Sequence, residues 1–590
     1  MKASIAFLAT LLFIISAAAQ NVGIGTVTPL QRLHVSGNVN VDSAAGYYLN
    51  NKRILFGDGN GNFFAGEDAG PVTTEGFYNT AIGLQSLDSN TTGNYNASLG
   101  YKALFDNTEG SFNSAFGFRA MSTNITGESN TATGYAALNG NKTGQNNTAY
   151  GRQSIRANVD GSRNTGMGTF TLFNNTASEN TAVGYSSMYE NSTGIENVAV
   201  GASALRANTT GSENTACGFM AMLANRSGSG NTAIGSSALR NDTSGTLNVA
   251  VGNDALLTNV NGSYNTAVGA NSLNANRTGS RNTAIGYQAI QIDSIGNNNT
   301  SVGYQSMYSN SQGSNNAVLG YQSLYLNQSG NVNTATGEQS LYKNNSGNGN
   351  TASGYQSLYN NVLGTGNTGI GMFSLYTNNT GGQNTGLGVS ADVSTGNLTN
   401  ATALGWNATV NASNKVVIGS NTAGMVIGGY APWSNLSDGR FKENVEENVP
   451  GLSFITRLRP VTYIINNKKL DEHVMQLMPE AIKLRRLQAA EEYAKTDGFI
   501  HTGFIAQEVE QAADEIGYKF DAVNKPANIT DTYSLSYAEF VVPLVKAVQE
   551  LHAGNEAKDA AINLLKKENE DIRNQLKEMK TLIQQLQQQE

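Results

Sequence analysis

The chain has 590 residues, a formal net charge of −8 and one cysteine. An acidic balance with no basic run before residue 437 excludes nucleic acid as a partner for most of the chain. One cysteine excludes an intrachain disulfide and a zinc site built from several cysteines.

The N-terminus has the features of a secretory signal. Lys2 precedes an apolar run over residues 5–15, and small residues follow as far as Ala19. The run is too short to span a bilayer, and no later apolar segment is long enough. We therefore predict that residues 1–19 are removed and that the mature chain is secreted or lies at a bacterial cell surface, without a membrane span. Residues 20–65 are expected to form short strands and turns.

Residues 66–420 repeat with a period of 17 residues. A glycine recurs at this spacing from Gly66 to Gly405, with one residue deleted before Gly184. In most repeats an asparagine stands four residues before the glycine, and Leu, Met or Ile stands four residues after it. A period of 17 is too short for a pair of helices. It predicts one coil of a parallel β-solenoid per repeat.

Stacking places identical residues of successive coils above one another. Each asparagine can then hydrogen-bond to its copy in the next coil, and the Leu/Met column is expected to be buried. Glycine and asparagine tolerate the positive φ angles that tight turns need. Cys217 occupies a repeat position filled mostly by Val, Ile, Leu or Thr, so we expect it to be a small buried residue.

A lone 17-residue coil would have a small apolar core, which favours three chains packed side by side. The Asn-Thr-Ala-x-Gly sequence of the coil is similar to the Asn-Ser-x-Ala-x-Gly sequence of the trimeric autotransporter adhesin head. That resemblance implies a trimeric β-roll, although the period of that family is shorter. The predicted fold is mainly β: a trimeric parallel β-solenoid or β-roll, then a small α+β domain and a C-terminal coiled-coil helix.

The repeat fades in residues 421–436, which we interpret as a linker, and a charged region follows. Residues 453–465 alternate enough to predict a pair of strands around Pro460. Residues 468–495 are predicted to be helical, and residues 503–515 are predicted to be a strand that leads into a helix.

The last predicted element is a helix over residues 537–590, with Ser536 as its N-cap. Its core positions alternate by three and four residues, which predicts a coiled coil. Asn555 and Asn569 stand at positions where a polar residue fixes register. The seam comprises Val541, Leu544, Val548, Leu551, Asn555, Lys558, Ile562, Leu565, Asn569, Ile572, Leu576, Met579, Ile583 and Leu586.

Four sequence blocks of this tail occur in a fixed order. They are SDGRFKE from residue 437, GLSFITRLRPVTY from 451, GFIAQEVE from 503 and YAEFVVPLVKAVQEL from 537. Together they resemble the peptidase S74 family, the self-cleaving intramolecular chaperone domain at the C-terminus of phage tail fibres and tailspikes. The resemblance covers residues 434–590. It implies a chaperone domain over 437–536 and a homotrimer held by the final helix.

The resemblance also implies a single-turnover serine–lysine endopeptidase. Ser437 would be the nucleophile, Lys442 its general base, and Leu436–Ser437 the bond that is cut. We assign Asp438 and Arg440 to positioning. Three residues of a second block would shape the site: Gly503, Gln507 and Glu508.

His501 is an alternative base, although an ordinary strand histidine is the simpler interpretation. The sequence contains no ligand cluster for a metal ion and no cofactor motif. A serine and a lysine five residues apart are a weak signal by themselves, because a solvated turn has the same composition. The accompanying blocks make the signal specific.

These features favour a secreted trimeric fibre or adhesin-like surface protein whose tail templates folding and then cuts itself off. Its external partner would be a cell-surface glycan or protein receptor. One alternative is a tailspike-like enzyme that degrades polysaccharide, which needs paired carboxylates. Another is a structural or ice-binding solenoid with an uncleaved tail.

Overall fold

The computed structural model describes residues 22–24, 33–41, 45–70, 75–420, 437–487 and 499–588. The predicted signal segment 1–19, the linker 421–436 with Leu436, and part of the predicted helix 468–495 lie outside these residues. The chain divides into two compact units, residues 1–282 and 283–590.

The first unit begins with short strands and continues as a solenoid. β1 (Val22–Ile24) pairs in parallel with β2 (Leu33–Val35). β3 (Gly46–Leu49), β4 (Lys52–Gly57) and β5 (Phe63–Ala65) are antiparallel, and β5 begins the parallel series. Each later strand pairs with its equivalent in the next coil: β6 Thr80–Ile82, β7 Ala97–Leu99, β8 Ser114–Phe116, β9 Thr131–Thr133, β10 Thr148–Tyr150, β11 Thr165–Met167, β12 Thr181–Val183, β13 Val198–Val200, β14 Thr215–Cys217, β15 Thr232–Ile234, β16 Val249–Val251 and β17 Thr266–Val268.

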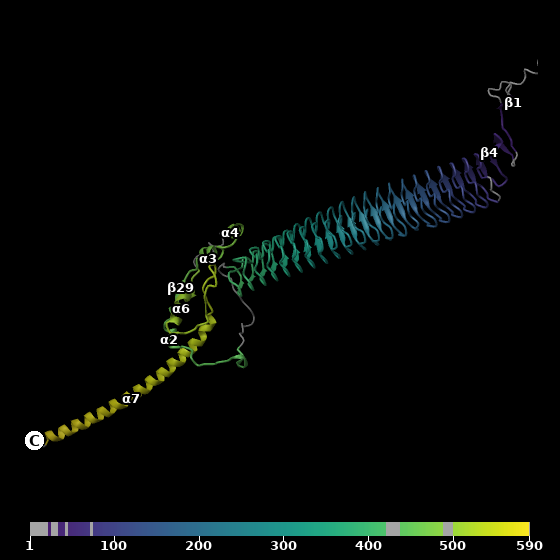
Figure 1. The fold of residues 1–590 in the computed structure, drawn as a ribbon. Helices are drawn as coiled ribbons and strands as arrows, with labels where there is room; N and C mark the ends of the chain where they lie inside the picture. The colour runs from purple at the N-terminus through teal and green to yellow at the C-terminus, as the bar shows by residue number, and fades with distance from the viewer. Residues whose placement is uncertain are drawn as a thin grey trace, which may run out of the picture. The chain divides into compact units, whose positions relative to one another are not determined.

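The second unit opens with further coils of the same kind. Their strands are β18 Thr283–Ile285, β19 Thr300–Val302, β20 Ala317–Leu319, β21 Thr334–Thr336, β22 Thr351–Ser353, β23 Thr368–Ile370, β24 Thr385–Leu387, β26 Thr402–Leu404 and β28 Val416–Ile418. The last coils add a small parallel pair, β25 (Asp392–Val393) with β27 (Thr409–Val410). The predicted parallel β-solenoid, with about 21 turns of about 17 residues, is confirmed (Figure 1).

In the three-residue strands only the middle residue faces inward. Ala216 is fully buried, whereas Thr215 and Cys217 on either side point outward, as the two-residue period of a strand requires. The expectation that Cys217 is buried is therefore wrong: this thiol is exposed. Aliphatic residues at its repeat position belong to an outward column.

Two asparagine ladders and an aliphatic column fill the interior. In the first ladder the Asn96 backbone N–H donates to Asn79 Oδ1 at 2.9 Å. In the second the Asn107 amide donates to Asn90 Oδ1 at 2.8 Å. Both Asn96 and Asn107 also donate to the Gly110 carbonyl. These asparagines are essentially inaccessible to solvent, as is the Leu/Met column that contains Leu104. The predicted ladder and buried column are confirmed.

The turns differ from the prediction in one respect. The repeat glycines have positive φ, for example +129° at Gly354, but the ladder asparagines are not among the positive-φ residues. Other residues take that conformation instead, including the buried Leu358 at +52°. A left-handed conformation costs a non-glycine residue about 1–2 kcal/mol. Full burial of a leucine side chain contributes about as much in the opposite direction.

One coil is shorter than the others. Gly168 and Gly184 are 16 residues apart, and the missing residue falls in a turn, where the Asn175 amide donates to Ala177 O at 2.8 Å. The strands are unaffected, since β11 and β12 keep their register. The amide ladder is affected, because Asn158 Oδ1 has no partner in the described part of the chain.

The tail of the second unit is a small α+β domain with a long helix. Its elements are η1 Gly439–Phe441, α2 Leu452–Ile455, β29 Val461–Tyr463, α3 Asn467–Val474, α4 Glu480–Leu487, β30 His501–Gly503, α6 Ala506–Asp514, β31 Val523–Asn524, β32 Ser534–Leu535, η3 Tyr537–Phe540 and α7 Val541–Gln587. β29 pairs antiparallel with β30, and β31 with β32.

The tail differs from the sequence-based predictions in part. The predicted strand pair around Pro460 is wrong: a short helix, α2, precedes this proline, and β29 finds its partner in β30, some 40 residues on. The strand-to-helix prediction near residue 503 is confirmed by β30 and α6. The final helix begins with a 3₁₀ turn, and Ser536 precedes it without a side-chain cap bond.

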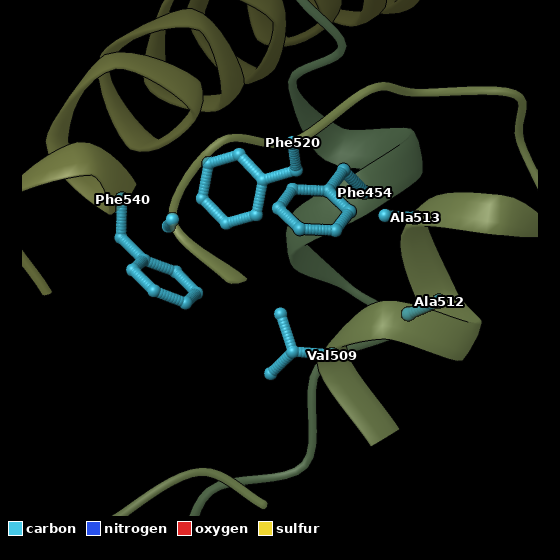
Figure 2. Packing of buried hydrophobic residues seen from close by; sticks show 7 residues of the cluster. Phe454, Val509, Ala512, Ala513, Phe520 and Phe540 are labelled. Atoms are coloured by element: carbon cyan, nitrogen blue, oxygen red, sulfur yellow. The ribbon is translucent and has the colours of Figure 1, made fainter. Parts of the chain in front are cut away.

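Three phenylalanines form the centre of the small domain. Phe454 of α2, Phe520 and Phe540 meet edge to face, with ring centroids 4.9 Å apart in each adjoining pair. Val509 and two alanines of α6 close the cluster (Figure 2). The Leu452 backbone N–H donates to Glu550 of α7 at 2.7 Å, so the base of the long helix is fixed to this core. Beyond the core, the apolar seam of α7 is about half exposed, for example at Leu565 and Leu576.

Candidate active site

The structure brings the predicted serine and lysine together. Lys442 Nζ donates a hydrogen bond to Ser437 Oγ at 2.9 Å. The intervening 3₁₀ turn η1 reverses the chain, and the Lys442 backbone N–H closes it on Gly439 O at 3.2 Å. A spacing of five residues therefore places the two side chains side by side. Both are exposed to solvent.

Asp438 and Arg440 form the frame of this turn. The Asp438 carboxylate accepts from the Arg440 backbone N–H at 3.0 Å, and the Arg440 guanidinium reaches both carboxylate oxygens. The hydrogen bonds from Arg440 hold the pKa of Asp438 below its ordinary value. The carboxylate thus stays ionised and suits positioning rather than proton donation.

The second predicted group gathers around two residues that sequence reasoning did not select. Gly503 lies against Tyr537, whose hydroxyl oxygen accepts from the Phe504 backbone N–H at 2.9 Å, and a Cβ at Gly503 would overlap that hydroxyl. Glu508 pairs with Arg459, and this hydrogen bond lowers the pKa of Glu508. Arg459 lies in the second sequence block and Tyr537 in the fourth. Their place in these blocks is the sequence feature that could have indicated them.

Gln507 lines a cavity of about 550 Å³ with Tyr463, His473, Asp531 and Tyr537. His501 is at the start of β30, where its ring packs on Tyr463 and Phe499 at centroid distances of 5.6 and 4.9 Å. This packing favours the interpretation of His501 as a strand histidine. Lys442 donates its hydrogen bond to Ser437, so the serine–lysine pair forms without a histidine.

A loop of the tail contacts the last solenoid coils of the same unit. Asn528 Nδ2 donates to Asn411 O at 2.7 Å, and Asn411 Nδ2 donates to Thr530 O at 3.1 Å. Lys415 pairs with Asp531 at 2.9 Å. Burial raises the pKa of Asp531, but hydrogen bonds from the Ala527 amide and Lys415 outweigh this, and the pKa lies below its ordinary value. The contact joins the tail to the end of the array through ionised and amide groups.

The described residues include no group of three or more His, Cys, Asp or Glu side chains that could hold a metal ion. Within the same residues, no helix is both long and apolar enough to cross a membrane.

Comparison with known families identifies the segment that carries the candidate pair. Residues 437–518 match the Peptidase_S74 family model, described as chaperone of endosialidase. The match begins at Ser437 and includes the turn, the β29–β30 pair and α6. No protein in the curated collection matches the chain.

Proposed function

We propose, from the S74-type segment at 437–518, that this chain is a secreted, trimeric fibre or adhesin-like protein whose tail assists its folding and then cuts itself off. An S74 chaperone domain that follows a β-solenoid fits a protein of the tail-fibre or tailspike type. The secretory features of residues 1–19 favour a cellular surface protein with a glycan or protein receptor. The carrying observation is the 2.9 Å hydrogen bond between Lys442 and Ser437.

The chemistry starts at the serine hydroxyl. Ser437 Oγ attacks the carbonyl carbon of Leu436, and Lys442 Nζ, in its neutral form, accepts the hydroxyl proton. The C–N bond of the Leu436–Ser437 peptide breaks, the same proton passes to the new amine of Ser437, and an ester joins Leu436 to Ser437 Oγ. Water then hydrolyses that ester. The products are a chain that ends at Leu436 and a tail that begins with Ser437.

The solvent exposure of Ser437 and Lys442 in the single chain suggests that cleavage depends on assembly. A lysine acts as a base only when neutral, and removal from water is what disfavours its charged form. In the single chain both Ser437 and Lys442 are exposed. Burial of the pair by neighbouring copies would provide the missing environment, so we propose that the tail cleaves after trimerisation. The seam of α7 gives the copies an apolar surface on which to associate.

Two substitutions test the proposed pair. Ser437→Ala removes the nucleophile, and Lys442→Arg keeps the charge but supplies a group that does not lose its proton near neutral pH. We expect each variant to remain one uncut chain that still assembles, while the wild-type protein yields fragments separated at Leu436–Ser437. Denaturing gels and N-terminal sequencing of the smaller band measure this.

Ser453→Ala and Lys468→Arg, both at exposed tail positions, are matched controls and should cleave normally. Cleavage of Ser437→Ala at the wild-type rate would show that Ser437 is not the nucleophile. Normal cleavage of Lys442→Arg alone would direct attention to His501 as the base.

A further inference from the structure

The outward residues of the solenoid strands form an uncharged column. In the first unit, the last residue of each strand points outward, and several large apolar ones are about half exposed: Leu99, Phe116, Tyr150, Met167, Val200 and Ile234. The two outward positions of each strand are its first and last residues. In β6–β17 neither of them is a charged residue in any coil. In the second unit, Ile285, Leu319, Ile370 and Leu387 repeat the pattern on their own strands.

Charges in the same coils lie outside the strands. In the coil of β14, for example, Arg206 and Glu213 are exposed in the turns, while Thr215 and Cys217 are the outward strand residues. Contiguous apolar surface of this extent normally marks an interaction site.

The repeat determines what can cover this column. Successive strands are paired in register, so the outward side chains recur at the strand spacing of about 4.8 Å. A partner that covers the column over many coils must present apolar groups at the same axial spacing. A second copy of this chain, aligned in parallel, does so by construction.

We infer that the outward face of the solenoid strands is the surface on which copies of this chain pack, with equivalent coils side by side. This inference rests on the proposed trimer and adds the face through which the arrays meet. It places the exposed Cys217 of one copy near the Cys217 of its neighbours, because the thiol stands in the column itself.

Cys217 provides the test, since it is the one cysteine of the chain. The purified full-length protein is treated with the thiol oxidant diamide, which takes two hydrogens from a pair of thiols, and is analysed on a non-reducing denaturing gel. A disulfide needs Cα atoms within about 7 Å. We expect a band of two linked chains, and one chain of each trimer left unlinked because a disulfide uses two thiols.

The control carries Cys217→Ser together with Thr210→Cys, which moves the thiol to an exposed turn of the same coil. This control should remain unlinked. Sedimentation of the untreated protein separates the two proposals. A trimer whose Cys217 thiols do not link would overturn the packing face and leave the proposed function intact. A monomer that neither links nor assembles would overturn both.

Discussion

Asp242 occupies a position that asparagine fills in the neighbouring coils of the second ladder. Its Oδ1 accepts from the Gly245 N–H and from Asn259, each at 3.0 Å. An ionised carboxylate has no N–H to donate to the preceding coil, and both Asp242 Oδ2 and Asn225 Oδ1 lack a partner among the described residues. A proton on Asp242 would supply the missing donor. Burial raises the pKa of Asp242 from 3.8 to about 7, against hydrogen bonds that lower it.

This pKa shift predicts a pH-dependent stability. In the unfolded chain Asp242 titrates near 3.9, so between about pH 4 and pH 7 the folded array binds more protons than the unfolded chain. The contribution of Asp242 to stability is therefore complete below pH 4 and is lost as pH rises through about 7. Burial alone raises the pKa of Asp242; the hydrogen bonds from Gly245, Asn259, Ser244 and Thr243 lower it, and no charged group is among the causes of the shift.

We expect Asp242→Asn to stabilise the array at pH 8 by about 1–3 kcal/mol, the cost of leaving a buried polar group unsatisfied. The gain should shrink at pH 4, where the aspartate is protonated. Thermal unfolding of both proteins at the two pH values measures it. Asp254→Asn, at an intermediate-exposure turn position of the next coil, is the control. Equal stabilisation at both pH values would contradict the role of the proton.

At the scale of the element, the glycine column sets how closely coils approach. A Cβ on Gly354 would lie 2.7 Å from the backbone carbonyl of Gly371 in the next coil, and its φ of +129° excludes ordinary side chains. Gly349 of the same coil differs: its φ is +65°, and the nearest atom to an added Cβ is 4.0 Å away. Other coils carry Asn146 or Leu247 at that position.

Gly354→Ala should therefore destabilise the array by more than the 1–3 kcal/mol or so that a sparsely populated backbone conformation costs alone. Gly349→Ala should cost only about 1 kcal/mol, since its conformation is one that other residues adopt. Resistance to protease and the midpoint of thermal unfolding compare the two. Similar losses in both variants would show that contact between coils at Gly354 does not limit the solenoid.

The seam of α7 is the second element with a separable role. Replacing Leu565 and Leu576 by lysine puts charges at positions that face a neighbouring helix in a coiled coil. We expect fewer trimers and slower cleavage at Leu436–Ser437. Gln575→Lys with Lys567→Glu, which changes exposed residues off the seam, is the control. Sedimentation and denaturing gels of the same samples measure both effects, and normal cleavage by a seam variant that stays monomeric would uncouple them.

Periodicity accounts for how far the sequence predicted this fold. The 17-residue period predicts one solenoid coil per repeat. The recurring asparagine predicts the first ladder, because stacked coils place identical residues next to one another. The burial of Cys217 was predicted wrongly because aliphatic residues fill its repeat position in other coils, yet these residues point outward in the single chain. The strand pair around Pro460 was wrong because β29 pairs with β30, and no local pattern encodes such a distant partner. The Ser437–Lys442 pair followed from resemblance, whereas Tyr537 and Arg459 needed three-dimensional contacts.

At the scale of the whole molecule, array and tail have different stability requirements. Each coil contacts mainly the coils next to it, so a folded array depends on nearest-neighbour terms once it exists. The first coils to fold can pair in the wrong register, because a shift by one coil replaces each contact between coils with a nearly identical one. The tail contacts the last coils through Asn528 and Asp531, where it can fix the first register.

Residues 20–436 obtained by cleavage of the full chain should therefore stay assembled and resist protease, owing to slow unfolding. The same residues expressed without 437–590 should aggregate or lack a defined size. Light scattering and limited proteolysis compare the two preparations, whose sequences are identical. Efficient folding of the separately expressed array would mean that the tail is a removable anchor and not a folding aid.

The gaps in the second asparagine ladder have a mechanical consequence. Under tension along the solenoid axis, stacked coils carry the load in series, so every coil of residues 75–282 experiences the same force. Rupture then begins where the bonds between neighbours are fewest. Three ladder oxygens of residues 75–282 lack an amide partner: those of Asn158, Asn225 and Asn276. Pulled from its ends, this part of the array should yield first at these three levels, and the coils with complete ladders should extend later.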